Sequence, residues 1–497
     1  MTPSGTKRIH VPRTSFQVFV FFMILNCCAG FFQGTGNTDE IWNFTFGWQA
    51  SMGHLPYRDF NMLQTPLSAW INGLSMALLG RQVLVFRFNG AILFSLIALA
   101  MRRISLRFGA DAYASLLPGM IFSALMCTNV FLEYSCLILF FQLVIMNCDM
   151  QAMDAGTGMK KRTLVLTGVL AGLCILSKQT TGVFLCLASL ITAFLTNRKD
   201  HPWKAMECRL SGMCIPCLLF LAYLLFTGTF HDFMDYCFYG ISTFTAKGSY
   251  DWYLSTGTGN MLHGILMPVP VLAACILCIQ KRKEKEGKTL LIFLILLAGG
   301  LINMYPITNY YHMTVALGPA LCLVPRMLTL MDEKLFHKDI FGSLVKIVPA
   351  GYLLFALCGY AIIGKSEGMT MLDVPHFKGV MSEPFRKEEM ELLSPYIEQV
   401  LSEGSEIYIL DNTAEYCLIP YDIYHKDLDM FLYGNLGTRT PQECLEESLE
   451  ESAYYLIADS TRSNTQFPSS EIRAFEKKLK KTGETEGFAF CNNDVNN

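Results

Sequence analysis

The segment Gly36-Asn-Thr-Asp-Glu-Ile-Trp-Asn-Phe44 places two adjacent carboxylates directly after the first long apolar run of the chain. A run of about 17–25 apolar residues can cross a membrane as a helix, so Asp39 and Glu40 are expected at a membrane surface. They indicate one wall of a functional site. The alternative is the first turn of an ordinary helix, which Thr38 could cap and whose dipole favours early acidic residues. The spacing alone leaves both interpretations open.

Ten further apolar runs follow the first one. Hydrophobic residues make up 52% of the 497 residues and charged residues only 16%, whereas soluble domains carry about 25% charged residues. The sequence therefore predicts an α-helical polytopic membrane protein with about 11 transmembrane helices. The runs lie near residues 15–33, 83–101, 112–130, 133–150, 163–178, 180–196, 209–228, 259–280, 288–305, 312–330 and 341–363.

Basic clusters between these runs predict the orientation of the chain. Lysine and arginine are enriched in the cytoplasmic loops of membrane proteins. Every strongly basic loop falls inside if the N-terminus is cytoplasmic, and the loops 34–82, 229–258 and 305–311 and the tail after residue 364 then fall outside. The clusters are Arg102, Arg103 and Arg107; Lys160, Lys161 and Arg162; Arg198, Lys199 and Lys204; and Lys281 to Lys285.

Two apolar segments near the N-terminus need separate treatment. Lys7 and Arg8 precede the first run, as in a signal peptide, but this run continues to Phe32 and exceeds the roughly 7–15 residues of a signal core. We therefore expect it to remain as a helix. The segment from Pro66 to Gly80 is short and contains polar residues, so we expect an interfacial helix. A crossing there would put the first basic cluster outside.

The tail predicts a second domain, because helical and strand-like segments alternate there. We expect a small C-terminal α/β extracytoplasmic domain at 365–497, beside a transmembrane domain at 1–364 whose first outer loop, 34–82, carries the acidic segment. The predicted helices are Lys387–Glu403, Pro441–Ser452 and Glu471–Lys481, and the predicted strands are Glu406–Asp411, Ala453–Ala458 and Gly487–Phe490. The 18 cysteines lie mostly in apolar runs and show no zinc spacing or disulfide framework.

Three more polar stretches are predicted on the same face as Asp39. The stretch from Tyr57 to Pro66 offers an arginine fork for a phosphate, for Asp59 or for Asp39; its alternative is an interfacial loop with aromatic anchors. The stretch Ser177-Lys-Gln-Thr180 interrupts two apolar runs with a cation. Such a lysine is costly unless it meets an anion such as a lipid phosphate, although a snorkelling lysine at a helix end is common.

The last stretch, Asn303-Met-Tyr-Pro-Ile-Thr-Asn-Tyr-Tyr-His312, is an outward turn rich in amides and rings. These groups suit sugar rings and His312 suits a phosphate, but an interfacial aromatic belt has a similar composition. A partly desolvated carboxylate can act as a general base, so Asp39 is the candidate catalytic residue. The candidate substrate-binding residues are Glu40, Tyr57, Arg58, Asp59, Gln64, Lys178, Gln179, Asn309, Tyr310 and His312.

The order of these motifs resembles the GT-C superfamily of glycosyltransferases. The similarity is to the family 39-like branch, with the protein O-mannosyltransferases and the aminoarabinose transferases of lipid A. It covers about residues 30–330 and rests on Asp39-Glu40, Tyr57 to Phe60, a Thr-Pro-Leu helix ending at Gly80, Arg87, Ser177 to Gln179, and Tyr305 to His312. Two features depart from the pattern. Gln64-Thr65-Pro66 stands where many relatives carry a basic or histidine residue before Pro-Pro, and the tail does not match the sugar-binding modules of the mannosyltransferases.

The resemblance implies a polyprenyl-phosphate-linked sugar donor and an inverting transfer of a hexose or pentose outside the cytoplasmic membrane. Asp39 would be the catalytic carboxylate, and Lys178 would stabilise the departing lipid phosphate. The acceptor would be a protein, glycan or lipid; no nucleic acid is expected. Oligosaccharyltransferases of the superfamily hold a divalent ion with several acids, but the outer acids here are scattered, so no metal or cofactor is predicted.

A lipid or sugar transporter or flippase without transferase activity is the main alternative. Such proteins carry charged or Gly/Pro-broken positions in mid-span and often show half-repeats. In this sequence the polar residues cluster at one predicted surface and the two halves do not resemble each other. A non-catalytic scaffold would leave Asp39 and Lys178 unexplained. The pattern therefore favours the transferase.

Overall fold

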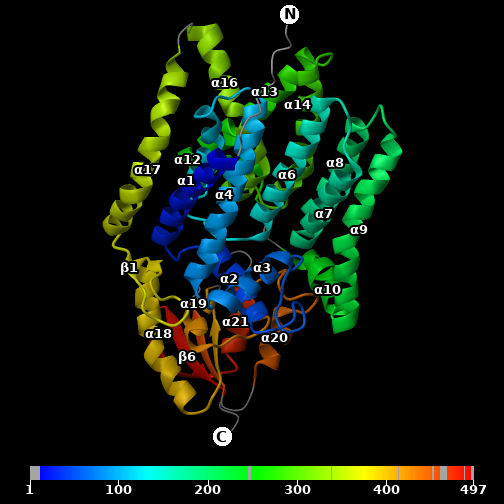
Figure 1. Cartoon of the computed structure of the whole chain (residues 1–497). Helices are drawn as coiled ribbons and strands as arrows, with labels where there is room; N and C mark the ends of the chain where they lie inside the picture. Colours follow the sequence, from blue (N-terminus) through cyan, green and yellow to red (C-terminus); the bar gives the residue numbers. More distant parts are fainter. Residues whose placement is uncertain are drawn as a thin grey trace, which may run out of the picture.

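Long helices form a bundle at one end of the molecule and a small sheet domain lies at the other (Figure 1). The computed structural model describes residues 12–244, 248–336, 339–411, 413–449, 453–458, 467–485 and 487–493. The basic residues Lys7 and Arg8 lie outside these ranges. The short helices α2 (Thr38–Ser51) and α3 (Leu67–Leu79) lie between the bundle and the sheet domain (Figure 1).

The bundle confirms the predicted multi-pass helical class. Within the described ranges, nine helical segments are long and apolar enough to cross a membrane. They are α1 (Pro12–Phe32), α4 (Val83–Arg107), α6 (Tyr134–Ala155), α8 (Gln179–Thr196), α9 (Pro202–Thr227), α12 with α13 (Thr258–Leu266, Val269–Gln280), α14 with η4 (Lys285–Gly300, Leu301–Met304), α15 through η5 and α16 into η6 (Tyr310–Leu317, Gly318–Leu323, Val324–Met331, Asp332–Phe336), and α17 (Ile340–Ser366). The other two predicted runs form shorter helices, η1 with α5 (Ala114–Leu116, Leu117–Leu125) and α7 (Lys161–Ser177).

Helices α7 and α9 show how the bundle packs. A side chain at Gly168 or at Gly212 would collide with the backbone of the facing helix, so both positions require glycine for this close approach. Arg209 on α9 is fully buried and pairs with Asp149 on α6 at 2.7 Å. Because both charges are buried, the pair fixes the relative positions of the two helices, and breaking it would leave an uncompensated charge.

The segment from Pro66 to Gly80 forms a short helix, α3, as the sequence predicts, and its interfacial position stays a prediction. Its 13 residues span about 20 Å at 1.5 Å per residue, less than the roughly 30 Å of a bilayer core. Leu74, Leu78 and Leu79 are 65%, 74% and 64% exposed, while the opposite side packs on α2 through Gly73. Between α9 and α12, the connecting segment forms the short helices α10 (Phe230–Met234), η2 (Asp235–Tyr239), η3 (Gly240–Thr243) and α11 (Tyr250–Ser255).

The tail folds into a small α/β domain, as the sequence predicts. Its four-stranded sheet has the order β3-β4-β6-β5; β3 and β4 are parallel and the other neighbours are antiparallel. The strands are β3 (Ile407–Leu410), β4 (Tyr454–Ala458), β5 (Lys480–Thr485) and β6 (Phe488–Asn492), with a separate ribbon of β1 (Thr370–Met371) and β2 (Met381–Ser382). The helices are α18 (Pro384–Ser402), α19 (Glu415–Leu418), η7 (Ile419–Tyr421), α20 (Pro441–Glu447) and α21 (Ser469–Glu476).

Two boundaries in the tail differ from the predicted ones. The helix predicted over Glu471–Lys481 ends at Glu476, and Lys480 begins the edge strand β5, which pairs with β6. This strand is polar and exposed, so it lacks the apolar alternation that identifies a strand, while edge lysines are typical of protected sheet edges. Helix α20 ends at Glu447; residues 450–452 of the predicted segment lie outside the described ranges.

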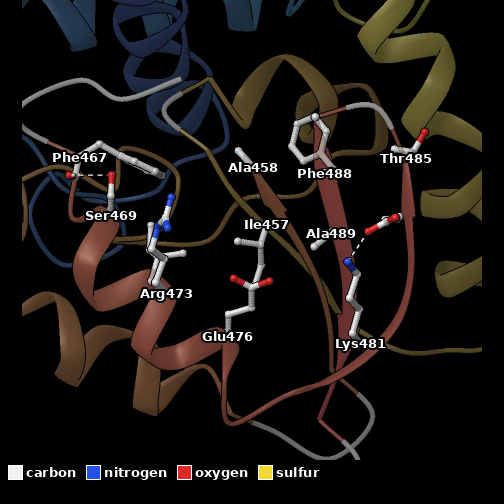
Figure 2. A pocket seen from close by; sticks show the side chains of 13 residues that line it. Ile457, Ala458, Phe467, Ser469, Arg473, Glu476, Lys481, Thr485, Phe488 and Ala489 are labelled. Carbon is white, nitrogen blue, oxygen red and sulfur yellow. Dashed lines mark hydrogen bonds and ion pairs between the residues drawn. The ribbon is translucent and has the colours of Figure 1, made fainter. Parts of the chain in front are cut away.

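A pocket of about 300 Å³ opens between α21 and the strands β5 and β6 (Figure 2). Arg473 and Glu476 come from the helix, and Lys481 pairs with Glu484 on β5. Every lining residue belongs to the C-terminal domain, so this pocket is separate from the four polar stretches identified in the sequence. The 18 cysteines, all within the described ranges, form no disulfide with one another.

Candidate active site

Helix α2 begins at the acidic segment. The Asn37 side chain caps it by accepting a hydrogen bond from the Asp39 backbone N–H at 3.0 Å, whereas Thr38, the predicted cap, is already the first helical residue. Asp39 and Glu40 occupy the first turn, which confirms the helix-start interpretation. Asp39 is accessible to solvent, yet desolvation by the surrounding protein and the nearby Glu133 raise its pKa to about 6, against the opposing effect of Lys178. A carboxyl with such a pKa is suited to accept a proton near neutral pH.

Lys178 lies at the junction of α7 and α8 and acts electrostatically on the Asp39 carboxylate. Its Nζ donates to Asn303 Oδ1 at 3.1 Å and lies 5.5 Å from the centre of the Tyr134 ring. Asp39 and Glu133 both act on it electrostatically. A protonated amine here is thus held by one neutral hydrogen bond and two nearby carboxylates. Lys178 therefore has donor capacity left for a ligand.

Glu133 is the functional candidate that sequence reasoning undervalued. It caps α6, with Oε2 accepting from Ser135 N–H at 2.7 Å and Oε1 from Cys136 N–H at 2.6 Å. It is 3% exposed and close enough to raise the pKa of Asp39. The available signal was an acidic residue directly before a long apolar run, which is typical of a helix cap. Glu133 serves as that cap and also contributes negative charge to the site.

The two adjacent carboxylates of the opening segment have different surroundings. Glu40 is buried and forms a two-point ion pair with Arg87, at 2.7 Å from Nε to Oε1 and 2.8 Å from Nη2 to Oε2. Gln33 Nε2 donates to the same carboxylate at 2.9 Å. The Arg87 guanidinium also donates to the carbonyl oxygens of Gly30, Gln33 and Gly34. Arg87 thus links the Glu40 carboxylate to the backbone of the loop before α2. Through this ion pair, Glu40 holds the loop in place. A direct contact of Glu40 with substrate stays a prediction.

The stretch from Tyr57 to Gln64 forms a folded loop beside the site. Tyr57 is fully buried, and its hydroxyl donates to the Gln64 carbonyl oxygen at 3.0 Å. Arg58 and Asp59 pair with each other at 2.9 Å, with Arg58 54% exposed, so of the two predicted partners of Arg58 the structure shows Asp59. These two charges are not brought to Asp39. Their contact with substrate, and that of Tyr57 and Gln64, stays a prediction.

Of the remaining predicted residues, Gln179 follows Lys178 in the chain and His312 interacts with it electrostatically. Gln179 Nε2 donates to the carbonyl oxygens of Leu63 and Cys237, which ties the stretch 57–66 and the loop 229–258 to α8. Asn309 caps α15 and accepts from the His312 backbone N–H at 2.8 Å. Tyr310 stacks on His263 with ring centres 4.3 Å apart. His312 lies within electrostatic range of Lys178.

Three of the four polar stretches therefore meet around Lys178. The segment 36–44 contributes Asp39, the stretch 177–180 contributes Lys178, and the stretch 303–312 contributes Asn303 and His312. The fourth stretch, 57–66, contacts this group through its backbone, because the Leu63 carbonyl oxygen accepts a hydrogen bond from Gln179. A carboxylate and an ammonium group at one site can take a proton from one molecule and neutralise an anion on another. Within the described ranges, no group of three or more His, Cys, Asp or Glu side chains could hold a metal ion.

Comparisons with solved structures identify the fold. A crystal structure of ArnT from Cupriavidus metallidurans bound to undecaprenyl phosphate aligns over 97% of this chain and 99% of that chain, with a TM-score of 0.56 and 14% identity. The apo form of the same protein aligns over 96% and 97%, with a TM-score of 0.59 and 12% identity. The chain has a GT-C fold. A scan against protein-family models finds no match, and a search of the curated proteins finds none.

A second group of GT-C structures shares this fold. The oligosaccharyltransferase AglB from Archaeoglobus fulgidus, in complex with an inhibitory peptide and a dolichol-phosphate, aligns over 97% of this chain and 74% of that chain. Its TM-score is 0.53 and its identity 11%. At such low identity the likeness establishes the GT-C architecture, a polytopic bundle with a further C-terminal region. It carries no residue roles to this chain.

Proposed function

We propose that this chain is an integral-membrane glycosyltransferase that transfers a sugar from a polyprenyl-phosphate-linked donor to an acceptor outside the cytoplasmic membrane. The observation that carries the proposal is the electrostatic interaction of Lys178 with Asp39. Asp39 lies on α2, the helix at the end of the bundle that faces the C-terminal domain (Figure 1). The GT-C fold supports it, since its neighbours hold undecaprenyl phosphate and dolichol-phosphate in their structures. The structural similarity suggests the class of donor, and the charged side chains of Asp39 and Lys178 suggest how this chain would carry out the transfer.

In the proposed reaction, Asp39 takes the proton of the acceptor hydroxyl as the acceptor oxygen attacks the anomeric carbon of the donor sugar. The bond between that carbon and the phosphate oxygen breaks, and its electron pair leaves with the polyprenyl phosphate. A single displacement of this kind inverts the anomeric configuration. The sugar is a hexose or pentose, and the acceptor is a protein, glycan or lipid.

Lys178 would face the departing phosphate. Negative charge grows on the phosphate oxygen as the glycosidic bond breaks, so a fixed ammonium group stabilises the transition state more than the ground state. Asn303 holds the Lys178 Nζ at 3.1 Å. This contact places the cation before the donor binds, so little reorganisation is needed during the reaction.

The orientation of the chain is also part of the proposal. Contacts gather the four basic clusters at one end of the bundle: Arg107 pairs with Asp154 at 3.4 Å, Thr289 donates to Asp154 at 2.8 Å, and the Met159 N–H donates to Asn197 at 2.8 Å. The C-terminal domain and α2, which carries Asp39, lie at the other end (Figure 1). Positive charge favours the cytoplasmic side, so we propose that the site and the domain lie outside.

Replacement of Asp39 by Asn tests the proposal in cells. The variant keeps the size of the side chain but removes the base. We expect Asp39→Asn to leave the surface glycans and glycolipids, measured by mass spectrometry, identical to those of a deletion strain. The control is Asp251→Asn, at an exposed outer-loop position in α11. A full wild-type profile with Asp39→Asn at normal membrane levels would show that Asp39 is not the base, and a transporter would explain such a result.

A further inference from the structure

The C-terminal domain contacts the loop that leads into α2. The Glu383 carboxylate accepts hydrogen bonds from the Thr35 N–H at 2.7 Å, the Thr35 hydroxyl at 3.0 Å and the Gly36 N–H at 3.3 Å. Ser382 adds a hydroxyl contact to Thr35 at 2.8 Å. The loop and Glu383 are separated by almost 350 residues in sequence. One carboxylate of the tail thus satisfies three donors just ahead of the proposed base.

Two features show that Glu383 is committed to this loop. It occupies the N-cap position of α18, yet its side chain makes no capping bond to its own helix. A carboxylate there would normally stabilise the helix start, so its use on the loop forgoes that local contribution. A side chain at Gly34 would also collide with the Glu383 carboxylate. The loop therefore fits around this group.

The contact continues toward Asp39 through Asn37. The Tyr416 hydroxyl of the C-terminal domain donates to the Asn37 carbonyl oxygen at 3.2 Å, and the Asn37 side chain caps α2 at the Asp39 N–H. The Asn37 Nδ2 donates to Asn129 Oδ1 at 2.7 Å on the membrane side. The start of α2 is therefore held between the bundle and the C-terminal domain, and Asp39 is two residues from that anchor.

We propose that Glu383 is a positioning residue, through which the C-terminal domain sets the place of Asp39 by holding residues 35–37. It touches neither reactant; its effect on the reaction passes through the loop and the Asn37 cap. This inference rests on the proposed function, because Asp39 must be the base for its position to affect turnover. It gives the C-terminal domain a role in the chemistry of the membrane site.

Amide hydrogen exchange tests the contact without any substrate. In the full-length protein in detergent, we expect Glu383→Ala to speed exchange at residues 35–40 by about tenfold or more, because three bonds to the loop are lost. Gly34→Ala should have the same effect, since it displaces the carboxylate while the glutamate remains. Glu391→Ala, on the same helix and paired with Lys387 across one turn, should leave these amides at the wild-type rate. Unchanged exchange in both Glu383→Ala and Gly34→Ala would overturn the inference.

Kinetics then separate positioning from a general loss of structure. The probe is a panel of undecaprenyl-phosphate-linked hexoses and pentoses, with release of undecaprenyl phosphate as the readout. We expect kcat for Glu383→Ala to fall by about 10- to 100-fold, because a misplaced base reduces turnover by about this factor. KM for the donor should stay within about twofold of the wild-type value, and Glu383→Gln should recover part of the lost kcat. When the start of α2 loosens, Asp39 is exposed to more water and its pKa falls toward that of an ordinary carboxyl group. The acid limb of the kcat profile should therefore move below pH 6.

The Asp39→Asn background distinguishes the two proposals. Glu383→Ala should add little to the loss already caused by Asp39→Asn, because both act on one group. If Asp39→Asn turns over normally, the proposed function fails whatever Glu383 does. If Asp39→Asn is inactive while Glu383→Ala keeps the wild-type kcat and acid limb, the positioning role alone is overturned.

Discussion

Arg87 binds both carboxylate oxygens of Glu40, at 2.7 and 2.8 Å, and both side chains are only 2% exposed. The neighbouring Asp39 stays accessible to solvent. Two adjacent acids thus have separate tasks: Glu40 anchors the loop before α2, and Asp39 is free to meet a reactant. Arg87 neutralises the charge of Glu40 within the protein, so Glu40 adds little to the electric field around Asp39.

Breaking this pair should destabilise the fold. Arg87→Met leaves an uncompensated buried carboxylate, which costs about 3–5 kcal/mol, and Glu40→Gln leaves an uncompensated guanidinium. We expect both single variants to unfold at clearly lower temperatures in detergent, as measured by differential scanning fluorimetry. The double variant Arg87→Met/Glu40→Leu should lose less than the sum of the two. Strictly additive losses would show that the pair is not coupled.

Activity should depend on pH through Asp39. Desolvation and Glu133 raise its pKa to about 6, so the neutral, inactive acid predominates below that pH. We expect kcat/KM to fall about tenfold per unit below pH 6 and to level off above it. The measurement is undecaprenyl phosphate release from the donor panel between pH 4.5 and pH 8, a range chosen to bracket about 6. A profile that is flat across pH 6 would exclude a base with this pKa.

Lys178→Met should weaken binding of the lipid phosphate. Hydrogen bonds to charged groups contribute about 1.5–3 kcal/mol, which corresponds to roughly 10- to 150-fold in affinity. Titration of the purified protein with undecaprenyl phosphate measures this loss, and Lys378→Met, an exposed lysine of the C-terminal domain, serves as the control. The Lys178 charge lowers the Asp39 pKa, so the acid limb of Lys178→Met should move above pH 6. Equal affinities in both variants would refute the phosphate role.

The C-terminal domain should become less stable as pH rises. Glu415 and Asp429 are each 2% exposed. Burial and the nearby Asp429 raise the Glu415 pKa well above its usual range, and burial and Asp427 raise that of Asp429. The folded domain holds protons that the unfolded chain releases above the ordinary carboxyl pKa near 4, so stability is full below that pH and declines above it.

Neutral replacements should remove this dependence. We expect Asp429→Asn and Glu415→Gln to raise the unfolding temperature relative to wild type by more at pH 8 than at pH 5. Asp373→Asn, at an exposed position, is the control. An identical shift at both pH values would mean that the two carboxyl groups stay ionised in the folded domain.

Local patterns were sufficient to predict much of the fold. Apolar length identified the bundle, and the segment from Pro66 to Gly80 indicated a short helix, which the structure shows as α3. The six strand and helix segments predicted for the tail were recognisable from their periodicity and correspond to α18, β3, α20, β4, α21 and β6. Strand β5 was not, because a polar edge strand such as Lys480–Thr485 has no apolar alternation. Its identity comes from pairing with β6, a tertiary contact.

The site was predictable only in part for the same reason. Lys178 stood out as a charge between apolar runs, but its bond to Asn303 joins helices 125 residues apart in sequence. Glu133 looked like one more scattered acid until α6 was placed beside α2. The contact of Glu383 with Thr35 depends on how the tail domain docks on the bundle, which no local pattern encodes. Residue type indicated the chemistry, and packing determined which residues meet.

The most direct test of the central claim is the turnover of Asp39→Asn with undecaprenyl-phosphate-linked sugars. Loss of a general base reduces turnover by about 10²- to 10⁴-fold. We expect Asp39→Asn to release undecaprenyl phosphate at least a hundredfold more slowly than wild type while binding undecaprenyl phosphate with an affinity within about twofold. Turnover equal to that of wild type at matched protein levels would contradict the assignment of Asp39 as the base.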